Sequence, residues 1–109
     1  MAVTYKVLGQ VNPAATTLTT LYTCGSSAGA VASTLSICNQ GATSTTVRVA
    51  VRPAGASIAA QHYIAYDVQV SQYDSLYLTI GVSLANTDVV SVYAGTANIS
   101  FSLFGSEVS

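Results

Sequence analysis

The stretch Ser75-Leu-Tyr-Leu-Thr-Ile-Gly-Val82 sets the pattern for the whole chain, because an apolar side chain occupies every second position. The alternating apolar residues are Leu76, Leu78, Ile80 and Val82. A period of two is the signature of a β-strand with one buried face. The stretch therefore predicts a core strand whose even-numbered side chains point inward.

The same alternation, with β-branched or aromatic residues, recurs along the chain. The further predicted strands are Tyr5–Gly9, Thr17–Cys24, Val31–Asn39, Thr45–Pro53, Tyr63–Val70, Val89–Ala94 and Asn98–Phe104, the last also as a core strand. No segment has the helical spacing that parallel crossovers require, so the strands should pair antiparallel. The sequence predicts an all-β chain, a single antiparallel β-sandwich or jelly roll of about eight strands, with a closed small barrel as the alternative.

Length and composition indicate one domain that depends on partners. The chain has 109 residues with no internal repeat or linker, so we expect a single β-sandwich domain over residues 1–109, with a core from about 3 to 104 and short terminal extensions. A domain of this size buries only about 60–70% of the surface that its unfolded chain exposes. Further burial would have to come from other chains.

Charge is scarce, with three basic and four acidic residues in total. That is about a quarter of the usual charged fraction, so a solvated monomer is the least natural end state and a piece of an assembly is expected. Three cations cannot form a broad phosphate-binding surface, which argues against nucleic acid. No apolar run approaches the roughly 20 residues that span a bilayer, so we expect no membrane partner. The first ten residues do not resemble a secretory signal, so we expect folding in the cytoplasm.

The inventory of catalytic residues is thin. A site needs a nucleophile, an acid or base and a group that stabilises developing charge, but the one histidine, His62, has no glycine-framed serine nucleophile to serve. We expect a structural or interface role for it. Asp74 and Asp88 lie in turn sequences, where a carboxylate satisfies nearby backbone donors. We expect no catalytic residues, no metal site, no cofactor and no enzymatic activity.

The two cysteines, Cys24 and Cys38, lack the second pair or the histidines of a structural zinc site. In a reducing cytoplasm buried thiols are the commoner outcome. A disulfide remains the alternative if their strands are neighbours.

Candidate interface residues occur on two predicted strands. Arg48 and Arg52 are four positions apart on one strand, so both should project from the same face. Asp67 is expected to pair with one of them, within the sheet or across a subunit contact. Arg52 is the stronger choice, since Pro53 should end the strand and leave Arg52 near an accessible edge.

Tyr63 and Tyr66 are the aromatic candidates. Tyrosine is favoured on surfaces that are dry in the middle and wet at the rim. An ordinary half-buried strand position and a sugar-binding platform are the alternatives. The predicted interface residues are Arg48, Arg52, Asp67, Tyr63 and Tyr66.

Four phrases in the same order carry a family resemblance: VLGQVNPAATTLTTLYT (Val7–Thr23), VASTLSICNQGATSTTVRVAVRPAGASI (Val31–Ile58), HYIAYDV (His62–Val68) and DVVSVYAGTANISFSLFGSEV (Asp88–Val108). Over nearly its whole length the chain resembles small virion structural proteins of tailed bacteriophages, notably those of cyanobacterial and other aquatic hosts. The resemblance brings no catalytic motif.

The resemblance implies a noncatalytic component of the virion, assembled in the host cytoplasm. The expected role is a capsid cement or decoration protein that binds between capsomers, as a homo-oligomer and commonly a trimer. The expected partners are further copies of itself and the major capsid protein or other virion proteins. A tail, neck or baseplate component is the alternative, and a receptor or carbohydrate-binding module is a more distant one.

Overall fold

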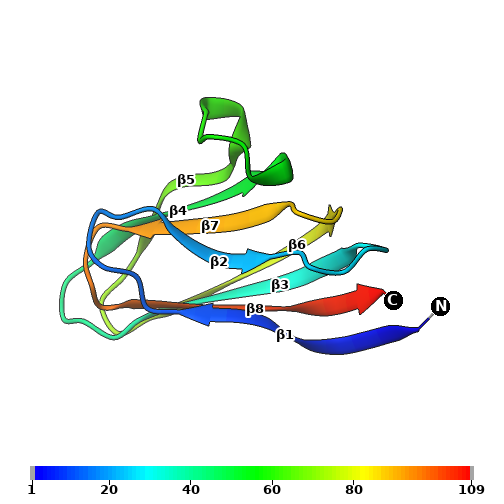
Figure 1. Cartoon of the computed structure of the whole chain (residues 1–109). Helices are drawn as coiled ribbons and strands as arrows, with labels where there is room; N and C mark the ends of the chain where they lie inside the picture. The colour runs from blue at the N-terminus through cyan, green and yellow to red at the C-terminus, as the bar shows by residue number, and fades with distance from the viewer. Residues whose placement is uncertain (1, 109) are drawn as a thin grey trace.

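The computed structural model describes residues 2–108, which fold into two four-stranded β-sheets packed face to face (Figure 1). The strands are β1 (Val3–Val11), β2 (Thr19–Thr23), β3 (Ala30–Asn39), β4 (Thr45–Arg52), β5 (Tyr63–Val70), β6 (Ser75–Leu84), β7 (Val89–Ala94) and β8 (Ile99–Val108). Sheet A has the order β1-β8-β3-β6, and sheet B has the order β2-β7-β4-β5. The predicted antiparallel sandwich is confirmed, and the two separate sheets replace the closed barrel.

The strand pairs reveal the topology. β1 pairs with β8, β2 with β7, β3 with β6 and β4 with β5, all antiparallel. The chain is thus one long hairpin, rolled up so that β8 also joins β3 and β7 also joins β4. This arrangement is the eight-stranded jelly roll.

The first and last strands are longer than their sequence patterns predict. β8 continues to Val108, because β1 pairs with it along its length, from Val3 opposite Val108 to Val11 opposite Phe101. This pairing carries Gly105 and Ser106 into the sheet despite their weak strand propensity. Gly105 also fits a crowded position, since a Cβ there would lie 2.0 Å from the Val31 carbonyl oxygen.

The core lies between the two sheets, and its side chains are buried more deeply on β8 than on β6. Asn98–Phe104 was rightly predicted as a core strand, because Ile99, Phe101 and Leu103 are fully buried. The core prediction for Ser75–Val82 is only partly right, because β6 is an edge strand and its inward side chains are half-buried. An open hollow of about 410 Å³ lies there, lined by β5 and β6 residues that include Ile64, Val68, Leu78 and Ile80.

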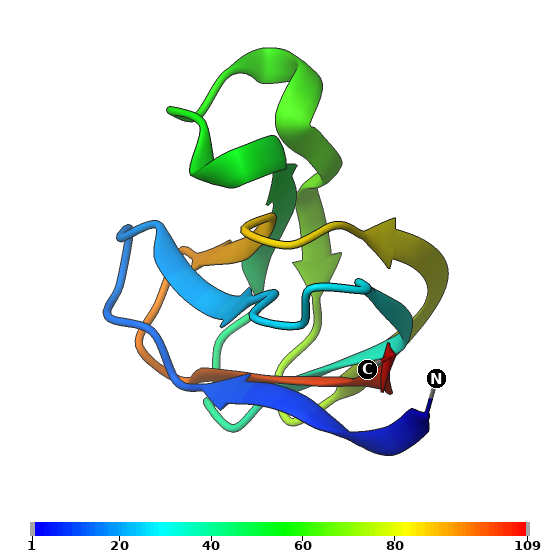
Figure 2. The same ribbon diagram turned by 45° about the vertical axis from the view of Figure 1, so that its right-hand side comes forward.

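A projecting loop, residues 53–62, joins β4 to β5 and stands off the sandwich (Figure 2). It contains two short 3-10 helices, η1 (Pro53–Gly55) and η2 (Ala60–His62). Hydrogen bonds fix its base: the Ala54 N–H donates to Asp88 Oδ1 at 2.8 Å, and Arg52 Nη1 donates to the Ala56 carbonyl at 3.1 Å. The loop places Ile58 in an exposed position beside β5.

Candidate interaction site

A bulge in β5 builds the centre of the candidate site. Val47 pairs with Val68 and Val49 with Ala65, so Arg48 on β4 alone faces both Tyr66 and Asp67 on β5. Such a bulge re-aims side chains that a regular strand would send to opposite faces. Asp67 adopts the left-handed backbone conformation, with φ of 53°, which aspartate tolerates better than most residues.

Arg48 is held on three sides by the groups that this geometry brings to it. Its Nε donates to Asp67 Oδ1 at 2.7 Å, and its Nη2 lies 3.5 Å from Asp67 Oδ2. The guanidinium carbon lies 4.2 Å from the ring centroid of Tyr66 and 4.5 Å from that of Tyr93, which is directly opposite on β7. The hydrogen bond to Asp67 raises the pKa of Arg48 above its ordinary value, so Arg48 keeps its positive charge.

Tyrosines extend the site toward the projecting loop. The rings of Tyr63 and Tyr66 meet edge to face, with centroids 5.0 Å apart. They border an open hollow of about 620 Å³ whose other lining residues, Ile58, Ala59 and Ala60, come from the loop. Tyr66 is 57% exposed. We call Arg48, Tyr63, Tyr66, Asp67 and Tyr93 the tyrosine–arginine cluster.

Four of the five predicted interface residues belong to this cluster, and Arg52 does not. Arg52 lies on the same outer face of sheet B as Arg48, as the alternation predicts, but its Nε donates to Ser91 Oγ at 3.2 Å and its Nη1 holds the loop. The expectation that Arg52 lies near an accessible edge is wrong, because β4 is a central strand between β7 and β5. Arg52 therefore anchors the projecting loop.

The other polar residues singled out from the sequence serve local structure. His62 Nδ1 accepts a hydrogen bond from the Ala59 N–H at 3.0 Å, which closes η2. Asp88 accepts from the backbone of Ala54 and Ala85, and Asp74 Oδ1 accepts from the Ser75 N–H. The predicted turn role of both aspartates is confirmed.

Neither cysteine is bridged. Cys24 is a buried free thiol and Cys38 is a half-buried one on β3. Nowhere in residues 2–108 do three or more His, Cys, Asp or Glu side chains gather as metal ligands would. The same part of the chain contains no helix with the length and apolarity to cross a membrane.

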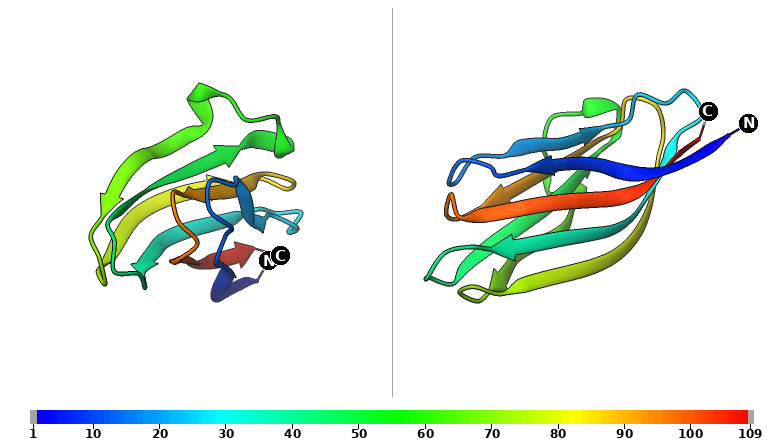
Figure 3. Two further views of the ribbon diagram at one scale, coloured as in Figure 1. Left: turned by 90° about the vertical axis from the view of Figure 1, so that its left-hand side faces the viewer. Right: turned by 90° about the horizontal axis from the view of Figure 1, so that it is seen from below.

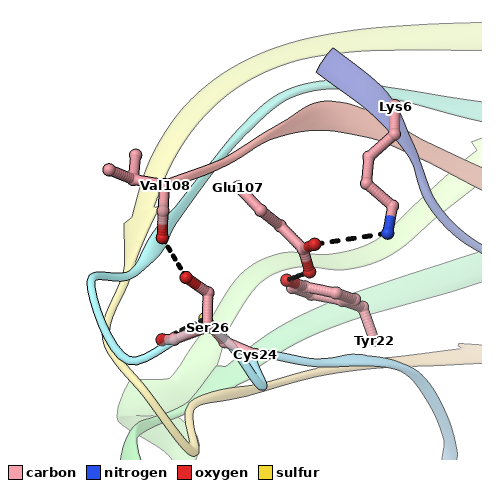
Figure 4. A network of polar contacts seen from close by, with 6 residues as sticks. All are labelled: Lys6, Tyr22, Cys24, Ser26, Glu107 and Val108. Carbon is pink, nitrogen blue, oxygen red and sulfur yellow. Dashed lines mark hydrogen bonds and ion pairs between the residues drawn. The ribbon is translucent and has the colours of Figure 1, made fainter. Parts of the chain in front are cut away.

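A second polar network, which the sequence did not reveal, links the two sheets at one end of the sandwich (Figure 4). Tyr22 of sheet B donates its hydroxyl to Glu107 Oε2 at 2.5 Å, and Lys6 Nζ lies 3.2 Å from Glu107 Oε1. The Tyr22 hydroxyl, followed by Lys6, lowers the pKa of Glu107, while burial and then Glu107 raise the pKa of Tyr22. Lys6 and Glu107 are neighbours only because β1 pairs with β8.

Comparison with known protein families, with curated proteins and with solved structures finds no match to this chain.

Proposed function

We propose that this chain is a noncatalytic structural protein of a tailed-phage virion, and most specifically a cement protein that binds the capsid between capsomers. The observation that carries the proposal is the tyrosine–arginine cluster, an exposed aromatic surface built around one fixed cation. Tyrosine and arginine are the residue types that dominate binding energy at protein interfaces. The sequence resemblance is the reason for placing the chain in a virion that is assembled in the host cytoplasm.

The proposed mechanism is binding energy added to the assembled shell. A protein that binds the assembled state and not its separated subunits stabilises the assembly by mass action. The chain would act in many copies, as a homo-oligomer that the resemblance expects to be a trimer, so modest contacts are multiplied by avidity. The expected partners are the major capsid protein or other virion proteins.

Binding to shells provides the test. Phage particles lacking this protein are mixed with the purified chain, and bound protein is measured by sedimentation. Tyr66→Ser should weaken binding about tenfold or more, since loss of an interface hot spot costs about 2 kcal/mol. Tyr73→Asn is the matched control, because Tyr73 is 72% exposed in the β5–β6 turn, away from the cluster, and its φ of 52° suits asparagine.

The outcomes separate the alternatives. Failure of the wild-type chain to bind shells, or equal binding by Tyr66→Ser, would overturn the cement role at this surface. Electron cryomicroscopy of intact particles then gives the copy number. A copy number close to that of the major shell protein supports cement, and a few copies at one vertex assign the chain to the tail, neck or baseplate.

Glycan binding is the second candidate, favoured by the hollow that Tyr63 and Tyr66 border beside the loop. Aromatic walls with nearby polar groups are common in small-molecule sites. Saturable binding of the isolated chain on a glycan array, abolished by Tyr63→Ser, would favour this role over shell binding.

A further inference from the structure

The outer face of sheet A is a broad surface that carries no charged side chain. Figure 3, right, looks onto this sheet from outside the sandwich, with β1, β8, β3 and β6 side by side. Strand alternation places serine, threonine and apolar residues on its outward positions. Its large exposed side chains are Val3, Tyr5, Val7, Val31, Tyr77 and Phe104, of which Tyr5 is 84% exposed and Tyr77 is 68% exposed.

The charged side chains of the described residues all lie elsewhere. Lys6 and Glu107 alternate with Tyr5 and Ser106, so they point to the other side of sheet A, where they meet Tyr22 (Figure 4). Arg48, Arg52 and Asp67 belong to sheet B, and Asp74 and Asp88 lie in turns. A partner that relies on charge, such as a nucleic acid or an anionic surface, finds nothing complementary on this face.

The polar groups of the face suit a copy of the face itself. Ser36 stands in register with Ser102 on β8 and with Tyr77 on β6. A hydroxyl both donates and accepts hydrogen bonds, so rows of hydroxyls can pair with identical rows, which rows of carboxylates or ammonium groups cannot do. A surface that meets its own copy must be self-complementary in this way.

The size of the face is sufficient for a specific contact. Four strands spaced about 4.8 Å apart and about 30 Å long present roughly 600 Å². Two copies in contact through this face would bury about 1,200 Å² or more, which reaches the range of stable protein interfaces. Burial would desolvate no charge, so the contact avoids the desolvation penalty of buried ions.

We propose that the outer face of sheet A is the surface through which this chain binds a second copy of itself. A shallow hollow of about 490 Å³ on the same face lies between β1, β8 and β3, and its lining includes Tyr5, Val7, Val31 and Phe104. Lys6 also borders the hollow, but its ammonium group pairs with Glu107. Tyr77 protrudes from the same face on β6. This inference deepens the proposed function. That the contact serves to build a virion rests on the proposed function. Contact between copies is nevertheless a property of the isolated chain.

The test is the mass of the purified chain as a function of concentration, measured by analytical ultracentrifugation. The wild-type chain should form dimers, because a face that binds its own copy closes as a two-fold pair. The double substitution Tyr5→Glu with Tyr77→Glu should weaken association at least a hundredfold, because unpaired charges would be buried in the contact. Tyr66→Glu is the matched control, with the same change at a comparably exposed tyrosine on sheet B, and should associate like the wild type.

Hydroxyl-radical labelling of the wild-type chain provides a readout that needs no variant. Tyr5 and Tyr77 should become protected as concentration rises, while Tyr66 stays reactive. A chain that is monomeric at millimolar concentration, or whose association depends on Tyr66 and not on Tyr5 and Tyr77, would overturn the inference. A monomer that still binds shells would refute self-association and leave the proposed function standing, even if shell binding then protects Tyr5 and Tyr77.

Discussion

Arg48 is the residue on which the tyrosine–arginine cluster depends. It joins three strands of sheet B, through an ion pair with Asp67 on β5 and ring contacts with Tyr66 on β5 and Tyr93 on β7. An exposed ion pair contributes about 0.2–1 kcal/mol, and an exposed cation–π contact about 0.5–1 kcal/mol. These contacts therefore add little to stability. Their main effect is to hold the rings of Tyr66 and Tyr93 in a fixed orientation at the surface.

The backbone of Asp67 gives a prediction for stability. Asp67→Val should lower the free energy of unfolding by about 1–2 kcal/mol, because a β-branched residue is strained at the positive φ of the bulge. Asp67→Asn keeps a residue that tolerates this conformation and should cost less than about 1 kcal/mol, the worth of the exposed ion pair. Urea unfolding of both variants measures the difference. Equal stability of the two would show that the bulge relaxes when Asp67 is replaced.

Sequence alternation predicted this region in part. It correctly placed Arg48 and Arg52 on one face, because the period of a strand is local information. It left open which arginine Asp67 would meet and missed Tyr93, because both depend on which strands are neighbours. The bulge in β5 was equally hidden, since its extra residue is set by pairing with β4.

At the scale of elements, the two sheets are linked at one end by a polar crossing. Tyr22 from β2, Lys6 from β1 and Glu107 from β8 share one carboxylate (Figure 4). Beside it the Ser26 hydroxyl donates to the Val108 carbonyl, and the Val108 N–H donates to the Gly29 carbonyl at 3.0 Å. These contacts tie the end of β8 to the segment between β2 and β3.

The lowered pKa of Glu107 predicts how this crossing responds to acid. The folded state favours the ionised carboxylate, so its contribution is present above the ordinary pKa of 4.5 and is lost as pH falls through the lower folded value. The stability difference between wild type and Glu107→Gln should be constant above about pH 5.5 and shrink below pH 4.5. Urea unfolding across pH 3–7 measures it. A difference that does not change with pH would show that Glu107 makes no ionisation-linked contribution.

The strands themselves also show what local sequence can predict and what depends on distant parts of the chain. The sequence predicts eight strands, and residues 2–108 contain eight. The clean alternation of β6 predicts a core strand, yet β6 lies at an edge of sheet A. Alternation reports only which face of a strand is apolar, whereas the extent of burial depends on the strand packed across from it.

At the scale of the molecule, every strand of the jelly roll pairs with a strand that mirrors it in the sequence, and β1 pairs only with β8. The sequence predicted the sandwich class from its strands and the absence of long helical segments. It could not choose the strand order, because many antiparallel orders satisfy the same alternation. The order matters for the proposed contact between copies, since it assembles the outer face of sheet A from β1 and β8 at the two ends of the chain and from β3 and β6 between them.

This topology predicts that the fold is indivisible. A chain ending at Gly95, which retains seven strands but lacks β8, should be unfolded, because both β1 and β3 lose the strand between them. Circular dichroism and urea titration measure this. A cooperative unfolding transition in the shortened chain would contradict the expectation.

The pairing of β1 with β8 also means that β1 cannot pair until the end of the chain has been synthesised. β1 ends at Val11 and β8 begins only at Ile99, so at ordinary translation rates, about 5–20 residues per second, β1 waits several seconds or more for its partner. During that wait its exposed edge and its Val3, Tyr5 and Val7 side chains are open to other nascent chains. The scarcity of charge leaves little electrostatic repulsion between neighbouring nascent chains during that time. Closely spaced ribosomes on one messenger RNA should therefore favour misassembly, and slower initiation of translation should raise the yield of folded protein.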